Sequence, residues 1–217
     1  MVDLTKLFSD LSNSVGMNGD KEPNSFRYHT VHYRDQEPLN VIEPDFENGP
    51  WIAGGACLRW YQDRPVDSSD IDVFCRSPKQ AADLIERIKS YRRFMVKAET
   101  ENAVTIEYSK KDGDWDDKWI IQVITKRFYN SLQEVVDNFD ITVCQIGTTG
   151  NEWVLGNYTA KDIREKNLRM VIPLHPDAVK RLTKYWTYGY RPVPGLLEMI
   201  QNNPESKWEF NPGEDYS

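Results

Sequence analysis

The sequence predicts an α+β fold, in which helices flank a mixed β-sheet and a helical region follows it. Two observations support this prediction. Short strand-like segments alternate with amphipathic helical segments between residues 28 and 157. From residue 158 onward the hydrophobic spacing is helical. With 217 residues, the chain is long enough to bury a sizeable core.

The first half of the chain alternates strand and helix signals. We expect a short helix and a linker over residues 1–27, and a short strand in "YHTVHYR". The segment "PWIAGG" reads as a strand ending in glycines, "ACLRWYQ" as a helix and "DIDVFCR" as a second strand. A longer helix follows, with Ser77 as its N-cap and Pro78 at its first position.

The second half completes the predicted sheet and then becomes helical. The strands "AVTIEYS" and "KWIIQVITK" flank an Asp-Gly hairpin, and Ser131 caps the helix "SLQEVVDNF". We expect strands in "DITVCQIGT" and "EWVLGNYT", joined by a Gly-Asn turn. Three helical segments then follow. The predicted organisation is therefore an αβ core over 28–157, a helical region over 158–203 and an acidic tail over 204–217.

Composition limits the classes of function. The net charge of −7 argues against sequence-independent binding of nucleic acid over the whole surface. Residues 161–191 nevertheless carry eight lysines and arginines against three acidic residues, so a local basic face is possible. Three separated cysteines predict neither a disulfide framework nor a zinc cluster. The sequence has no membrane-spanning apolar run and no signal peptide, so we expect a cytoplasmic protein.

Two features of residues 51–77 suggest chemistry. Gly54 and Gly55 lie between a strand and a helix, where backbone amides can approach a phosphate without an obstructing Cβ. Asp70 and Asp72 lie two residues apart on a strand and therefore point to one face. Such paired carboxylates suit a magnesium ion. Alone, the glycines fit an ordinary tight turn and the aspartates fit an exposed strand edge.

The combination "AGGACLRW…SSDIDVF" resembles the nucleotidyltransferase superfamily, which includes DNA polymerase β and CCA-adding enzymes. This resemblance implies a nucleotidyltransferase-like sheet over about residues 50–145. It also implies attack of a hydroxyl on the α-phosphate of a nucleoside triphosphate such as ATP, with two magnesium or manganese ions held by Asp70 and Asp72. Gly54 and Gly55 would contact the triphosphate, and Ser69 would bond a phosphate oxygen or serve as a turn residue.

The family normally adds a third carboxylate from a later strand. In "KWIIQVITK" the matching positions are Ile120 and Gln122, and glutamine is a poor ligand for a hard metal. Asp140 is the main alternative for this third catalytic and metal-binding position, and Glu107 is a weaker one. Asp140 also fits a residue that bonds backbone amides where the strand begins.

The helical region contains further candidate phosphate ligands. Lys180 and Lys184 are four residues apart and therefore share a helix face. Arg59, on the helix after the glycines, is another candidate, although it would equally pair with a surface acid. Tyr185, Trp186 and their aromatic neighbours are more typical of helix packing than of base stacking.

The leading hypothesis is a metal-dependent nucleotidyltransferase acting on a hydroxyl of RNA, protein or a small molecule. Two alternatives remain at this stage. One is a catalytically weakened member of the fold that binds nucleotide or another protein. The other is an inhibitor whose acidic surface mimics nucleic acid. The sequence leaves the oligomeric state and the base preference open.

Overall fold

The computed structural model describes residues 31–32, 35–66, 69–112, 115–171 and 177–202. The chain forms two compact units. The first runs from Tyr28 to Ala160, and the second takes in residues 1–27 together with Lys161 to Ser217. The expected N-terminal helix of residues 1–27 and the acidic tail of 204–217 lie outside the described residues.

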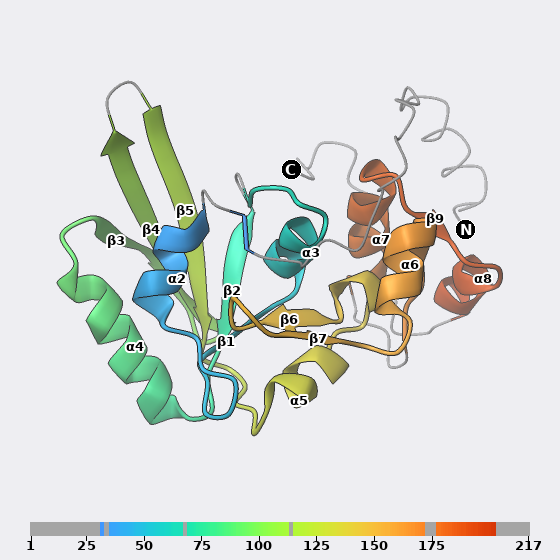
Figure 1. Cartoon of the computed structure of the whole chain (residues 1–217). Coiled ribbons are helices and arrows are strands. Elements are labelled where there is room, and N and C mark those ends of the chain that lie inside the picture. The colour runs from blue at the N-terminus through green and yellow to red at the C-terminus, as the bar shows by residue number, and fades with distance from the viewer. Residues whose placement is uncertain (1–30, 33–34, 67–68, 113–114, 172–176, 203–217) are drawn as a thin grey trace. The chain divides into compact units, whose positions relative to one another are not determined.

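The first unit is built on a seven-stranded sheet with the order β3-β4-β5-β2-β1-β6-β7 (Figure 1). The strands are β1 (Trp51–Ala53), β2 (Asp70–Phe74), β3 (Phe94–Glu99), β4 (Ala103–Asp112), β5 (Trp115–Ile124), β6 (Ile146–Thr148) and β7 (Trp153–Leu155). Only β2 and β5 pair in parallel, and every other pair in this sheet is antiparallel. The predicted mixed sheet is therefore confirmed.

The two faces of the central strands differ in exposure. Ile71 and Val73 of β2 are fully buried, as is Ile121 of β5. Asp70 and Asp72 occupy the alternate positions of β2 and are exposed or half-buried. Because side chains alternate between faces along a strand, the sheet has one apolar face and one open polar face that carries both aspartates.

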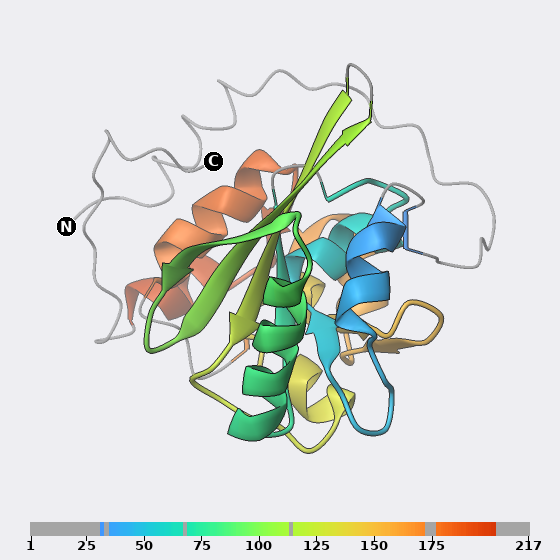
Figure 2. The same cartoon turned by 90° about the vertical axis from the view of Figure 1, so that its left-hand side faces the viewer.

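Helices cover the apolar face. Helix α4 (Pro78–Ser90) contacts β3 and β5, and α2 (Gln36–Ile42) packs against α4 (Figure 2). Ser77 caps α4 by accepting a hydrogen bond from the amide of Gln80 at 3.1 Å, as its sequence position predicts. Helix α3 (Gly55–Tyr61) begins at the second of the paired glycines and contacts β2.

Helix α5 (Leu132–Asp137) covers the polar face at its far end. Its residues Leu132, Val135 and Val136 form a cluster with Trp51 and Ala53 of β1. Phe74, on the same face as Asp70 and Asp72, packs against this cluster. This arrangement covers the sheet beside β1 and leaves the aspartate end of β2 accessible.

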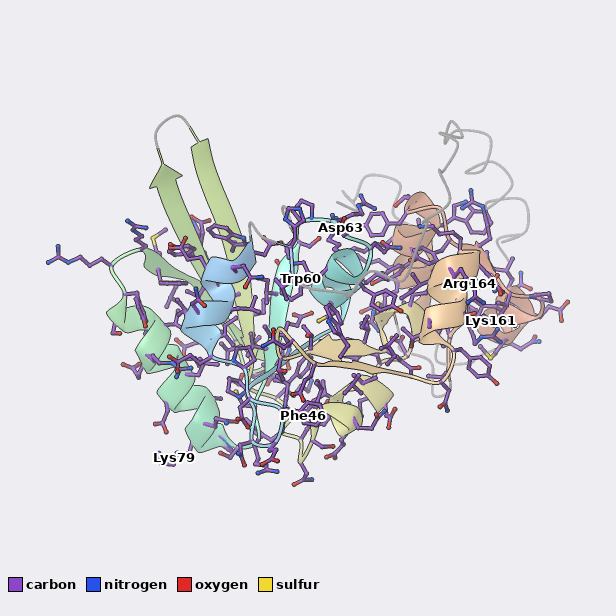
Figure 3. The ribbon with its side chains drawn as sticks, in the orientation of Figure 1. Phe46, Trp60, Asp63, Lys79, Lys161 and Arg164 are labelled. Atoms are coloured by element: carbon purple, nitrogen blue, oxygen red, sulfur yellow. The ribbon has the colours of Figure 1, made fainter. Side chains whose placement is uncertain are left out.

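A buried carboxylate joins three segments of the first unit. Asp35 is 2% exposed, and its Oδ2 accepts hydrogen bonds from Trp60 Nε1 at 2.8 Å and from the Val66 amide at 2.9 Å. Its Oδ1 accepts a hydrogen bond from Trp119 Nε1 at 2.7 Å. Trp60 belongs to α3 (Figure 3), so this network fixes the helix that carries the glycines. No local sequence pattern predicts this network.

The described part of the second unit is mainly helical. It contains α7 (Ala178–Thr187), α8 (Leu196–Gln201) and a two-stranded parallel sheet of β8 (Asn167–Leu168) and β9 (Arg191–Pro192). Helix α6 (Thr159–Glu165) spans the boundary between the units. Tyr185, Trp186 and Tyr190 are buried, in agreement with the predicted packing role.

Some predicted strands are wrong. "DITVCQIGT" contains the 3₁₀ helix η2 (Thr142–Cys144), and only Ile146–Thr148 forms a strand. The residues of "YHTVHYR" that the structure describes, Val31 and His32, are not in a strand. The helix expected from residue 160 ends at Glu165 and is followed by β8. Strand β3 was not predicted.

No helix within the described ranges is long and apolar enough to cross a bilayer.

Candidate functional site

The candidate site lies where β2 begins on the open face of the sheet. In the parallel register with β5, Asp70 pairs with Ile120 and Asp72 pairs with Gln122. Side chains paired in this way point to the same face. The structure therefore confirms that both aspartates share a face with Gln122.

Gln122 contacts the aspartate pair directly. Its Nε2 donates a hydrogen bond to Oδ2 of Asp70 at 2.6 Å. Gln122 thus lies at the strand position where the superfamily resemblance leads one to expect a carboxylate. Its neutral amide donates a hydrogen bond to the carboxylate of Asp70 and adds no third negative charge to the site.

Gly54 lies beside Asp72 and has a backbone conformation that requires glycine. Its φ of 92° and ψ of −139° fall in a region that residues with a Cβ rarely adopt. A Cβ at this position would lie 3.7 Å from Asp72 Oδ2 and 2.9 Å from Cε1 of Phe139. The first glycine is therefore needed for its conformation and for packing against Phe139, and it brings the strand–helix turn next to the aspartates.

Gly55 has a different environment. A Cβ built on Gly55 meets no described atom within 4 Å. Gly55 is the first residue of α3 and has no positive φ. The open space leaves room for a ligand beside this part of the backbone, and the contact of Gly55 with a triphosphate stays a prediction.

The pair Gly54→Ala and Gly55→Ala separates these two roles. We expect Gly54→Ala to lower the stability of the first unit by at least about 2 kcal/mol, since it combines backbone strain with displacement of Phe139. This corresponds to a fall in melting temperature of about 4–8 °C. Gly55→Ala is the matched control and should leave the melting temperature nearly unchanged. Equal effects of both substitutions on thermal unfolding would contradict this assignment.

The charge of Asp72 affects the pKa of Cys57, which lies on α3. Burial raises the pKa of the Cys57 thiol well above its ordinary value, and the negative charge of Asp72 raises the pKa further. Burial likewise raises the pKa of the Cys75 thiol to about 12. Because thiolates are the nucleophilic and metal-binding form of cysteine, both thiols are inert at neutral pH. Neither thiol is therefore a candidate nucleophile or metal ligand at this site.

The donor set fits one hard cation. Two carboxylates from one strand, with water and phosphate oxygens supplying the other ligands, are typical of magnesium sites. Among the described residues, no three histidine, cysteine, aspartate or glutamate side chains gather into a group that could hold a metal ion. Asp70 and Asp72 therefore belong to no such group of three within the part of the chain that the structure describes.

The two candidates for a third carboxylate have other surroundings. Asp140 is 9% exposed and lies between α5 and η2, next to Phe139. Its role as a third ligand stays a prediction. Glu107 shares the open face but lies on β4, two strands from β2, and pairs with Lys97 at 3.1 Å. This ion pair makes Glu107 a poor candidate.

The remaining predicted ligands are distributed over both units. Ser69 immediately precedes β2 and is half-buried, and Arg59 is half-buried on α3. Lys180 and Lys184 are exposed on α7 in the second unit. Their contacts with phosphate stay predictions.

A family model decides the classification of the chain. The model of the Gabija anti-defense 2 family matches residues 25–166, which is well over half of the chain and includes the glycines and both aspartates. The chain belongs to the Gabija anti-defense 2 family. A search of curated proteins gave no match.

Solved structures with a similar fold are CCA-adding enzymes. The Thermotoga maritima CCA-adding enzyme complexed with tRNA superimposes on this chain with a TM-score of 0.50 at 10% sequence identity. The match covers 82% of this chain and 46% of the enzyme. A CCA-adding enzyme complexed with CTP gives a TM-score of 0.53 at 12% identity, covering 81% and 47%. The chain thus spans less than half the length of these enzymes. At these identities the likeness establishes the nucleotidyltransferase-like fold, as the resemblance predicted.

Proposed function

We propose that this member of the Gabija anti-defense 2 family is a metal-dependent nucleotidyltransferase that acts against the Gabija defence. The observation that supports this most is the proximity of Gly54 to Asp72 Oδ2, with Asp70 on the same strand face. A strand–glycine–helix turn beside two carboxylates is the arrangement that a triphosphate and its cation require. The reaction would join a nucleoside monophosphate to a hydroxyl and release pyrophosphate.

Each residue of the site has a defined part in this proposal. Asp70 and Asp72 would hold magnesium or manganese, and Gln122 would orient Asp70 through its amide. The bound cation would lower the pKa of the attacking hydroxyl and stabilise charge on the phosphate. Gly55 would leave room for the triphosphate beside the start of α3. Ser69 and Arg59 are the proposed phosphate contacts within the first unit.

Label transfer tests the proposed reaction. The full chain is incubated with magnesium or manganese, each α-labelled nucleoside triphosphate, and in separate reactions total RNA, purified Gabija proteins or small hydroxyl compounds. We expect labelled acceptor and an equal amount of pyrophosphate in one of these reactions. If no triphosphate yields pyrophosphate with any acceptor, the proposed catalysis is wrong.

Substitution of Gln122 tests the cation site independently of turnover. Gln122→Glu replaces the hydrogen bond to Asp70 with a third negative charge, so the protein without cation should melt at a lower temperature. With manganese, the added oxygen ligand should tighten binding by about tenfold, or about 1.4 kcal/mol. Gln122→Met is the control, because it removes the hydrogen bond without adding charge. Equal manganese affinities of the two variants, measured by electron paramagnetic resonance, would refute a cation site next to Gln122.

Gln122 also favours a second candidate function. Because an amide occupies the position expected for a carboxylate, the site would hold a nucleotide or a partner without transfer. This function predicts triphosphate binding with no pyrophosphate, and anti-defence activity that persists in variants of both aspartates. The label-transfer experiment and the aspartate variants distinguish the two.

A further inference from the structure

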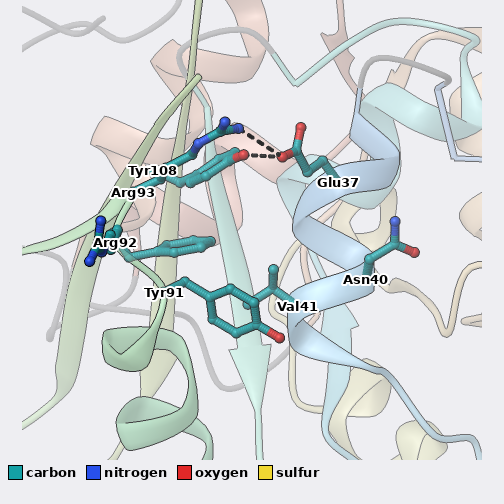
Figure 4. Close-up of a pocket in the computed structure, with 8 residues that line it drawn as sticks. Glu37, Asn40, Val41, Tyr91, Arg92, Arg93 and Tyr108 are labelled. Carbon is teal, nitrogen blue, oxygen red and sulfur yellow. Dashed lines mark hydrogen bonds and ion pairs between the residues drawn. The ribbon is translucent and has the colours of Figure 1, made fainter. Parts of the chain in front are cut away.

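A pocket lies on the face of the sheet opposite to the face that carries Asp70 and Asp72. It has a volume of about 340 Å³ and is lined by one side of α2, the turn after α4, and the first residues of β3 with β4 behind them (Figure 4). Tyr108 of β4 pairs with Trp119, whereas Asp70 pairs with Ile120. The one-residue offset places Tyr108 and the aspartates on opposite faces. The pocket is therefore separate from the candidate transfer site.

One wall of the pocket is a row of stacked aromatic rings. Phe94 and Tyr108 stack with their centroids 4.4 Å apart, and Tyr108 stacks on Trp119 at 5.1 Å. Tyr91 meets the edge of Phe94 and is 44% exposed at the rim. Aromatic walls of this kind bind planar rings, and stacking tolerates any base.

Arginine side chains make the rim cationic. Arg93 and the hydroxyl of Tyr108 both contact the carboxylate of Glu37, which lies on α2. Glu37 is thus already neutralised within the pocket. Arg92 is exposed and has no hydrogen bond or ion pair with any residue in the described ranges. An arginine in this position can bind a phosphate.

Asn40 supplies the polar group on the helical wall. It follows Glu37 by three residues on α2 and is among the residues that line the pocket. A carboxamide both donates and accepts hydrogen bonds, so it can pair with the edge of a nucleobase. The pocket is therefore lined by aromatic rings for a base, an arginine for a phosphate and a carboxamide for the edge of the base. Its volume is suited to one nucleotide.

We propose that this pocket binds a nucleoside monophosphate unit, either as a free nucleotide or within an RNA strand. The base would lie against Tyr91 and Phe94 with its edge toward Asn40, and the phosphate would contact Arg92. This site goes beyond the proposed transfer reaction, because it uses none of the residues that surround Asp70 and Asp72.

Calorimetric titration of the full chain in EDTA tests the pocket without the cation site. The ligands are the four nucleoside monophosphates, a six-nucleotide RNA and an oligoglutamate peptide. We expect binding of a monophosphate or of the RNA, weakened at least tenfold by Arg92→Ala or Tyr91→Ala. Asn40→Ala should reduce the preference among bases. Binding by a monophosphate indicates a free nucleotide, and binding by the RNA alone indicates a strand.

Matched controls keep the outcome specific. Arg127→Ala removes another exposed arginine, and Phe46→Ala removes another exposed ring, which is 43% exposed (Figure 3). Both controls should bind normally, as should the Asp70→Asn, Asp72→Asn double variant. The proposal is overturned if no nucleotide or RNA binds at millimolar concentration, if only the acidic peptide binds, or if Arg92→Ala binds as tightly as the unaltered chain. If the chain shows no transfer activity, binding to this pocket is still expected. The pocket proposal and the transfer proposal can therefore fail separately.

Discussion

Asp70→Asn and Asp72→Asn should each reduce nucleotidyl transfer by at least about a thousandfold, equivalent to about 4 kcal/mol of transition-state stabilisation. Each substitution removes one of the two proposed charged oxygen ligands and keeps the size of the side chain. Both residues lie on the open face of β2 and are exposed or half-buried, so the fold should be unaffected. Initial rates of pyrophosphate release with saturating manganese provide the measurement.

The unfolding behaviour of these variants provides the control. Removing one of two neighbouring negative charges relieves repulsion, so the melting temperature without cation should stay the same or rise. The unaltered chain should gain more stability from manganese than either variant does. Near-normal turnover by a correctly folded Asp72→Asn variant would argue strongly against the proposed catalysis.

Asp35→Ala should cause the largest loss of stability of any substitution considered. It leaves two indole donors and one amide buried without their acceptor, and we expect the free energy of unfolding to fall by about 3–5 kcal/mol. This corresponds to a decrease in melting temperature of roughly 6–20 °C for the first unit. Asp35→Asn should have a smaller effect, because its carbonyl oxygen can still accept hydrogen bonds. Chemical denaturation of the full chain measures the difference.

Asp83→Ala is the matched control for Asp35. Asp83 pairs with Lys79 on the exposed surface of α4, and such a pair contributes only about 0.3–0.5 kcal/mol. The account of the buried network is wrong if the two alanine variants unfold at the same denaturant concentration.

The features that sequence could predict are local or periodic. The alternation of "DIDVF" correctly placed Asp70 and Asp72 on one face, and the Asp-Gly pair correctly placed the hairpin between β4 and β5. The cap at Ser77 also follows from local chemistry. The glycines that follow a strand signal predicted a strand–helix turn. The structure places this turn near the aspartates because β1 and β2 are neighbours in the sheet.

The features that sequence missed depend on distant contacts or lack a pattern. Asp35 meets Trp119 across 84 residues of sequence, and no local signal marks that pair. Strand β3 is almost wholly exposed, so it has no alternation to detect. Residues 142–144 are all buried, and a continuous apolar run does not distinguish a strand from a helical turn.

Membership of the Gabija anti-defense 2 family and the nucleotidyltransferase-like fold together narrow the question of function. A fold does not by itself determine function, so function must be argued from the site. Here the site retains two carboxylates and the glycine turn but has an amide where a third carboxylate was expected. The proposed activity therefore depends on cation binding by Asp70 and Asp72.

Manganese binding in the presence of a nucleoside triphosphate tests that claim most directly. Electron paramagnetic resonance of the full chain, titrated with manganese and a non-hydrolysable triphosphate, measures the bound ion. We predict saturable binding that is lost in the Asp70→Asn, Asp72→Asn double variant and preserved in Asp83→Ala, which alters only an exposed ion pair on α4. Equal manganese binding by the double variant and the unaltered chain would contradict the account.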